Sequence, residues 1–115
     1  MNVLQILARV YTDNMERDLP FYEKLLNEKC ERVIDYREMN LKLARIGSIL
    51  IIGGTDESLE PFRETSSTFL VDSVEEYKDF LLKNGAVIIR DIRKVPTGFN
   101  MTVKHSDGII VEYVE

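Results

Sequence analysis

Two stretches of the sequence resemble each other 61 residues apart, and this internal repeat constrains the fold more than any other feature. Near the start the chain reads RVYTD and in the middle it reads FLVDS, which aligns Val10 with Val71. A helix-like stretch with a double leucine follows in each half, first FYEKLLNE and then YKDFLLKNG. The halves end on IGSILII and DGIIVEY, which align Ile51 with Glu112. Such a repeat is typical of a fold built from two copies of one supersecondary unit.

Each half predicts a strand, a helix and three further strands. Residues 3–11 alternate as a strand does, and their apolar face consists of Leu4, Ile6, Ala8 and Val10. Strand-like runs follow each helix: CERVIDYRE, LKLARI and ILIIGG in the first half, then AVIIRDI, NMTVKH and GIIVEYV in the second.

The predicted fold class is therefore α+β, with two βαβββ modules in one chain and mixed sheets that curl around a cleft. Residues 1–115 are expected to form a single domain. Its first module covers 1–53 and its second covers 65–115. Residues 54–64 carry a proline and several charges, which predicts a linker.

The two helices have different start signals. Ser73 and Glu76 are spaced as a capping box, and Asn84-Gly85 is a common helix end. In the first half, Pro20 is acceptable only in the first turn of a helix. We therefore expect that helix to begin near Asp18, with Asp18 as its cap.

Composition excludes several classes of function. The formal net charge of −5 argues against a nucleic-acid surface, which needs clustered Lys and Arg. No apolar run approaches the ~20 residues of a membrane span, and no basic segment precedes the first apolar stretch, so a cytoplasmic protein is expected. Cys30 is the single cysteine, which excludes an internal disulfide. His105 is the single histidine and precedes a Ser-Asp-Gly turn, where we expect it to be solvated.

The segments VYTD…FYEKLL and the closing HSDGIIVEY resemble the vicinal-oxygen-chelate superfamily, which includes glyoxalase I, bleomycin-resistance proteins and extradiol dioxygenases. The resemblance covers essentially the whole chain and implies the glyoxalase-like fold. It does not imply one activity, because a fold hosts many functions. Members usually pair their modules between chains, so the resemblance also implies a homodimer.

The resemblance further implies a metal site at four positions, one on the first and one on the last strand of each module. They correspond to Gln5, Ile51, Ser66 and Glu112. Gln5 and Glu112 are permitted ligands in the family, whereas Ile51 has no donor atom and Ser66 is a poor neutral ligand. A nickel, zinc or manganese ion would thus have an incomplete set, and we expect that no metal cofactor is needed.

Strand alternation predicts which side chains line the cleft. The expected lining residues are Gln5, Leu7, Arg9, Ile49, Ile51, Ser66, Thr68, Ile110 and Glu112. An apolar pocket with a few convergent polar groups is the usual make-up of a small-molecule site. The resemblance suggests that Arg9 contacts a ligand carboxylate, and an ion pair between Arg9 and Glu112 is the alternative.

Three hypotheses of function follow. The first is a ligand-binding protein of the bleomycin-resistance type that handles a small molecule without a complete metal site. The second is a metal-dependent glyoxalase-type lyase or isomerase, with Gln5 and Glu112 as remaining ligands and Glu112 as the catalytic base. The third is a structural dimer without a ligand.

Overall fold

The computed structural model describes residues 1–95 and 97–115 and divides the chain into two compact units. The N-terminal unit comprises Ala8–Glu64, and the C-terminal unit comprises Met1–Leu7 together with Thr65–Glu115. The first strand, β1 (Val3–Thr12), therefore contributes to both units. In the described part of the chain, no helix is long and apolar enough to cross a membrane.

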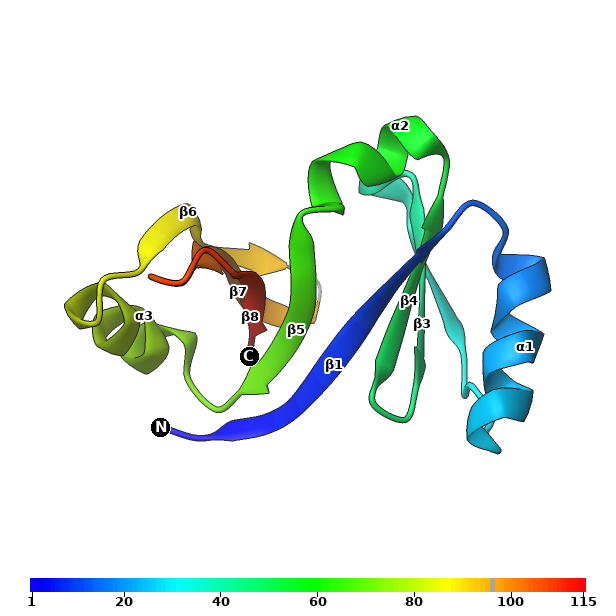
Figure 1. The fold of residues 1–115 in the computed structure, drawn as a ribbon, viewed down its shortest axis with the longest axis horizontal. Helices are drawn as coiled ribbons and strands as arrows, with labels where there is room; N and C mark the ends of the chain where they lie inside the picture. The colour runs from blue at the N-terminus through cyan, green and yellow to red at the C-terminus, as the bar shows by residue number, and fades with distance from the viewer. Residues whose placement is uncertain (96) are drawn as a thin grey trace. The chain divides into compact units, whose positions relative to one another are not determined.

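Both halves contain the predicted strand, helix and three strands (Figure 1). After β1 the first half consists of α1 (Met15–Leu26), β2 (Val33–Tyr36), η1 (Arg37–Met39), β3 (Leu41–Ile46) and β4 (Ile49–Gly54). The expected linker holds α2 (Asp56–Leu59) and η2 (Glu60–Phe62). The second half consists of β5 (Thr65–Val71), α3 (Val74–Lys83), β6 (Val87–Val95), β7 (Gly98–Lys104) and β8 (Ile110–Val114).

The sheet is mixed, which confirms the predicted α+β fold class with two βαβββ repeats. Its strand order is β2-β3-β4-β1-β5-β8-β7-β6. In each half the first strand pairs in parallel with the last one, β1 with β4 and β5 with β8. The pairs β2–β3, β3–β4, β6–β7 and β7–β8 are antiparallel. A parallel pair needs a long crossover connection, and the helix of each half lies within it.

The C-terminal unit has its core between α3 and one face of the sheet (Figure 1). The helix buries Val74, Tyr77 and Leu81, which lie one helical turn or two apart and so share a face. They pack against buried side chains of the sheet, which include Met101, Val103, Val111 and Tyr113.

The N-terminal unit has buried clusters on both faces of its strands. Ile51 lies in the cluster that α1 covers, together with Ala44, Ile46 and the half-buried Val10. Ile52, the next residue of β4, lies in the cluster that contains Leu59 of α2. Successive side chains of a strand point to opposite faces, so each helix covers its own face of β4.

Helix α3 begins as predicted, whereas α1 does not. The Ser73 hydroxyl accepts a hydrogen bond from the Glu76 amide at 3.3 Å. Helix α1 begins at Met15 rather than near Asp18, because the Asn14 side chain caps it and accepts from the Arg17 amide at 3.0 Å. Pro20 therefore lies inside the helix, beyond its first turn, and the expected start was wrong.

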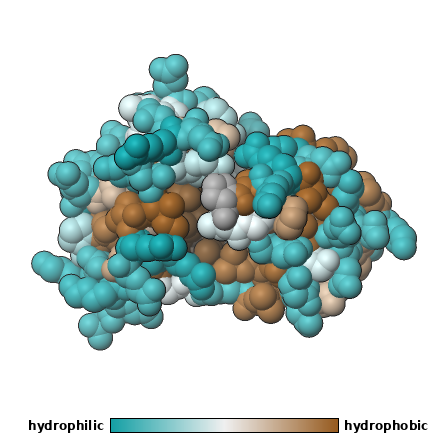
Figure 2. Space-filling model, turned by 180° about the vertical axis from the view of Figure 1, so that it is seen from behind, coloured by the Kyte–Doolittle hydropathy of each residue, from teal (hydrophilic) through white to brown (hydrophobic). Residues whose placement is uncertain are grey.

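The apolar face predicted for residues 3–11 is only partly covered. Leu4 and Ile6 are 67% and 51% exposed, whereas Leu7 on the other face is 3% exposed. Val10 is the member of the apolar face that packs in the α1 cluster. Apolar side chains that reach the surface appear as brown patches in Figure 2.

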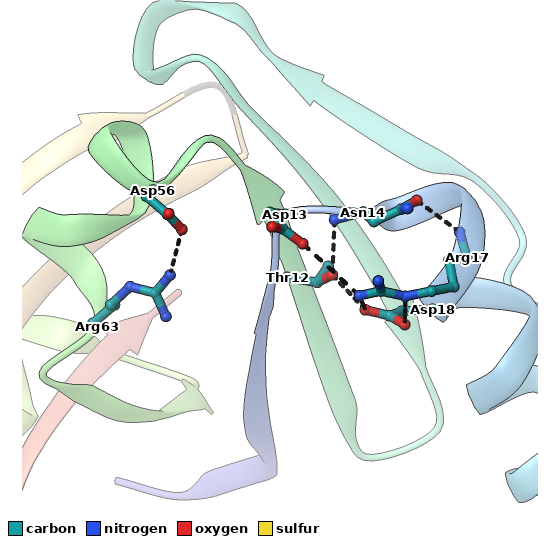
Figure 3. Close-up of polar contacts among 7 residues, drawn as sticks. All are labelled: Thr12, Asp13, Asn14, Arg17, Asp18, Asp56 and Arg63. Atoms are coloured by element: carbon teal, nitrogen blue, oxygen red, sulfur yellow. Dashed lines mark hydrogen bonds and ion pairs between the residues drawn. The ribbon is translucent and has the colours of Figure 1, made fainter.

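The entry to α1 is held by a small polar network (Figure 3). Arg17 donates to the Asp18 carboxylate, with Nε 2.8 Å from Oδ1, and the Thr12 hydroxyl donates to the same carboxylate. Thr12 in turn accepts from the Asn14 amide at 2.9 Å. The hydrogen bonds from Arg17 and Thr12 lower the pKa of Asp18 from 3.8 to about 2.

We predict that Asp18→Asn destabilises the fold by an amount that depends on pH. Because the pKa of Asp18 is depressed in the folded state, its contribution is fully present above pH 3.8 and is lost as the pH falls through about 2. The difference in Tm between wild type and variant should therefore be larger at pH 5 than at pH 2. Asp79→Asn, at an exposed position of α3, is the control, and an equal pH dependence in both variants would contradict the prediction.

Candidate functional site

Four polar side chains lie side by side across four neighbouring strands of the C-terminal unit. In the register of the sheet, Thr68 of β5 is opposite Glu112 of β8, and Glu112 is opposite Thr102 of β7. Thr102 is in turn opposite Arg90 of β6. Residues directly opposite each other project from the same face of a sheet and have Cβ atoms about 4.5–5.5 Å apart. We call these four residues the polar row.

The polar row lies on the face of the sheet that α3 does not cover. Val111 and Tyr113 flank Glu112 in the sequence, and both are buried in the cluster under α3. Alternation therefore directs Glu112 to the other face, together with Ile110. The two side chains are half-buried, so they are accessible to a bound molecule without being fully solvated.

Arg90 is tied to the strand next to it by several hydrogen bonds. Its Nη2 donates to Asn100 Oδ1 at 2.6 Å and to Thr102 Oγ1 at 3.4 Å. Its Nη1 donates to the backbone carbonyls of Asn100 at 3.3 Å and Asp91 at 3.2 Å. The guanidinium thus bridges the side chains of Asn100 and Thr102, which share a face because they are two residues apart on β7.

Four of the predicted site residues besides Glu112 also belong to the C-terminal unit. Thr68 is in the polar row and is 2% exposed. Gln5 lies half-buried on β1, the strand next to β5. Ser66 is exposed at an irregularity of β5, and its hydroxyl donates to the backbone carbonyl of Ile110 at 3.1 Å.

The two other predicted site residues, Ile51 and Arg9, belong to the N-terminal unit. Ile51 is 0% exposed and lies opposite Val10, with which it packs in the α1 cluster. The expectation that Ile49 and Ile51 share a face with Arg9 was therefore wrong, because Arg9 precedes Val10 and points to the other face. Arg9 Nη1 donates to the Tyr11 hydroxyl at 3.1 Å. An ion pair between Arg9 and Glu112 stays a prediction.

Three residues on the polar face were missed in the sequence analysis, namely Arg90, Asn100 and Thr102. The signal for two of them was present in the run NMTVKH, where Asn100 and Thr102 alternate with the apolar Met101 and Val103. Arg90 had no such signal, because the register between β6 and β7 shifts on both sides of it. Bulges of this kind re-aim side chains in ways that alternation does not predict.

His105 is not the solvated turn residue that we expected. It is half-buried at the end of β7, and its Nε2 lies 2.7 Å from the hydroxyl of Tyr113. The two rings also lie near Phe69 and Tyr77, within an aromatic group under α3. Burial raises the pKa of Tyr113 to about 12, so its hydroxyl stays protonated at neutral pH.

The residues at the four family positions do not fit a divalent metal ion. Ile51 points into the α1 cluster, and the Ser66 hydroxyl is already bonded to a backbone carbonyl. Of the four positions, Gln5 and Glu112 carry side chains of a kind that binds metal ions, whereas protein sites for zinc usually supply three or four ligands. Over residues 1–95 and 97–115, no group of three or more His, Cys, Asp or Glu side chains is arranged to hold a metal ion.

The N-terminal unit contains a separate cavity of about 560 Å³ that the sequence analysis did not predict. It lies where β1 and β4 end and where α1 and α2 begin. Its lining includes the carboxylates of Asp13, Asp35 and Asp56, the last of which also pairs with Arg63 at 3.3 Å (Figure 3).

The chain is similar to proteins of known structure over its whole length. A crystal structure of an uncharacterized protein from Methanosarcina mazei is 49% identical, with a TM-score of 0.88, over 100% of this chain and 94% of that one. Methylmalonyl-CoA epimerase from Mycobacterium tuberculosis is 12% identical, with a TM-score of 0.75, over 98% and 88% of the two chains. A Streptomyces coelicolor methylmalonyl-CoA epimerase in complex with 2-nitronate-propionyl-CoA is 13% identical, with a TM-score of 0.73, over 97% and 94%.

The two epimerases share the fold with this chain. No protein-family model matches the sequence, and no curated protein matches it significantly.

We predict that the protein binds no divalent ion stoichiometrically at Glu112, because the donor set is too small. Isothermal titration with nickel, zinc and manganese chlorides should give weak responses that are the same in wild type and in Glu112→Gln. Tight binding of one ion per chain that is lost in Glu112→Gln would contradict the prediction.

Proposed function

We propose that this chain, which has the glyoxalase-like fold and whose sequence resembles the vicinal-oxygen-chelate superfamily, binds a small molecule on the polar face of its C-terminal unit. The observation that carries this proposal is the polar row, in which the half-buried carboxylate of Glu112 lies between Thr68 and Thr102, and Thr102 accepts a hydrogen bond from Arg90. The cytoplasmic location expected from the composition is part of the same proposal.

The chemistry of the polar row supports a ligand with several polar atoms. Glu112 accepts hydrogen bonds when ionised, whereas hydroxyl groups both donate and accept. Ile110 and Val114 lie on the same face of β8 and supply apolar area beside the carboxylate. A few convergent polar groups on an apolar surface are the usual make-up of a small-molecule site.

A binding protein is the function that this donor set supports best, since it requires no complete metal site. An isomerase-type activity is the second candidate, and the position of Glu112 beside the Thr102 hydroxyl favours it. A carboxylate can remove a proton from carbon when a hydrogen-bond donor stabilises the charge that develops on a neighbouring oxygen. The epimerases that share the fold are named for a reaction on a CoA thioester, which supports the inclusion of carbonyl compounds among the candidate ligands.

A homodimer formed through β1 is a further part of the proposal. Leu4 and Ile6 lie on one face of the strand and are more than half exposed. Neighbouring exposed apolar side chains of this size are costly in water and often mark an interface between proteins.

We predict that Glu112→Gln weakens ligand binding by at least about tenfold, since a hydrogen bond to a charged group contributes roughly 1.5–3 kcal/mol. A library of small carbonyl compounds and organic acids, screened by thermal shift and followed by titration, provides the measurement. Glu31→Gln removes the same charge at an exposed position and should bind as the wild type does. Equal affinity in wild type and Glu112→Gln would contradict the proposed site.

The same ligands separate a binding protein from an isomerase. Incorporation of deuterium from D₂O at the carbon next to a carbonyl, seen by proton NMR and lost in Glu112→Gln, would favour the isomerase. Binding without such exchange is the expected outcome for a binding protein.

For the dimer, we predict that the double substitution Leu4→Asp and Ile6→Asp shifts the protein from dimer to monomer, because two charges cannot be buried unpaired at an interface. Sedimentation at several concentrations gives the dissociation constant, and circular dichroism checks that the fold is retained. Leu25→Asp, at a similarly exposed leucine of α1, is the control. A wild-type protein that is monomeric at all concentrations would refute this dimer.

A further inference from the structure

Two basic side chains, Arg93 of β6 and Lys104 of β7, lie on the same face as the polar row, beside its end at Arg90. Arg93 is opposite Asn100, and Lys104 follows Thr102 by two residues on β7, so both project from the face of Thr102. Both side chains are exposed. In the part of the chain that the structure describes, neither side chain forms a hydrogen bond or an ion pair. Both cations are therefore accessible to a bound anion.

Two irregularities of β6 bring Arg90 and Arg93 to this face. Residues three apart on a regular strand point to opposite faces. Between the two arginines the register shifts, so that three steps on β6 match the two steps from Thr102 to Asn100 on β7. Another shift separates Arg90 from Ile88, which packs against the core under α3. Bulges that re-aim side chains in this way are over-represented next to active sites.

The hairpin of β6 and β7 is basic, although the protein is acidic. Residues 87–104 contain four basic residues and one acidic residue, whereas the whole chain has a formal net charge of −5. The acidic residue, Asp91, is paired with Lys78 of α3 at 2.8 Å. Three of the four basic side chains lie on the polar face, namely Arg90, Arg93 and Lys104. The polar face of this hairpin thus carries positive charge that no acidic residue of the hairpin offsets.

We propose that Arg93 and Lys104 bind a phosphate group of the small molecule that occupies the polar face. This inference rests on the proposed function and adds a second subsite to the same face. A phosphate ester carries about −1.5 to −2 charges at neutral pH and has three strong acceptor oxygens, so donors from two strands can share it. Asn100 and Lys104 are about 14 Å apart along β7, and the long side chains of Arg93 and Lys104 approach the phosphate from opposite ends of this stretch.

The phosphate subsite is separated from the carboxylate of Glu112. Strand β6 is two strands away from β8, which corresponds to about 10 Å between Arg93 and Glu112. This distance is about one Debye length at physiological ionic strength, so the repulsion between the carboxylate and a phosphate beside Arg93 is largely screened. One ligand can therefore place a neutral carbonyl group over the polar row and a phosphate at the edge of the sheet.

The test is an NMR titration of ¹⁵N-labelled full-length protein with pyrophosphate, and with citrate at the same ionic strength. Pyrophosphate should shift the amides of β6 and β7 in the wild type. The double variant Arg93→Gln with Lys104→Gln should weaken its affinity by about tenfold, since each exposed ion pair contributes a few-fold. Citrate carries a comparable charge on carboxylates and should bind more weakly. No shift with pyrophosphate, or equal affinity for citrate, would overturn the phosphate subsite.

The matched control is the double variant Lys29→Gln with Arg32→Gln, which removes one lysine and one arginine at exposed positions of the N-terminal unit. It has the same net charge as the test variant and should bind pyrophosphate as the wild type does. Thermal unfolding shows whether both variants are folded, which is expected for changes at exposed positions. An equal loss of affinity in the two double variants would indicate a general attraction of anions and overturn the inference. The proposed function would remain intact, because neutral carbonyl ligands and Glu112→Gln test it separately.

Discussion

Val111 and Tyr113 of β8 are buried beneath α3, and this packing determines where the polar groups of the C-terminal unit lie. Burial of each such side chain contributes roughly 1.5–3 kcal/mol. A slip of the strand by one residue would expose both and bury Glu112 among Tyr77, Leu81 and their neighbours, at the high cost of an uncompensated buried charge. The position of Glu112 on the uncovered face is therefore a consequence of the core.

Burial of alternate side chains under α3 also determines which side chains of β7 lie on the polar face, beside those of β8. Met101 and Val103 are buried in the α3 cluster, so Asn100 and Thr102 must lie on the face of Glu112. Antiparallel pairing of β7 with β8 then sets Thr102 opposite Glu112. Arg90 projects from a third strand, β6. Alternation assigns Asn100 and Thr102 to a face, and the hydrogen bonds from Arg90 fix their rotamers.

The internal repeat predicted the order of elements and the face of Glu112, because both follow from local patterns of apolar residues. It failed for Ile51, which aligns with Glu112 at the offset of 61 residues. Val10 and Val71 do correspond, and each packs under the helix of its own half. Along the last strand the correspondence is lost, since Ile51 faces α1 whereas Glu112 faces away from α3. The irregularity of β5 between Thr65 and Ser67 changes the pairing of β5 with β8. The sequence of this segment contains no residue that predicts such an irregularity.

The start of α1 shows a different limit of sequence patterns. Pro20 predicted a later start because a proline within a helix leaves one backbone carbonyl without its N–H partner. That cost was outweighed by the Asn14 cap and by the network that joins Asp18 to Arg17 and Thr12. The start of such a helix is determined by side-chain contacts that form only in the folded protein. In the sequence, the same residues look like an ordinary polar loop.

The charges of Arg90 and Glu112 restrict which ligand groups the proposed site would favour. Arg90 donates to Asn100 and Thr102, so its positive charge acts on a bound molecule through two neutral side chains. A neutral amide is less costly to desolvate than a guanidinium, and a hydrogen bond from a cation to its oxygen strengthens its N–H donors. Glu112 on the opposite side disfavours a full negative charge nearby. For the proposed small-molecule site, this arrangement favours a carbonyl oxygen over a carboxylate, since a carbonyl is neutral when it binds and gains from strong donors if negative charge develops on it.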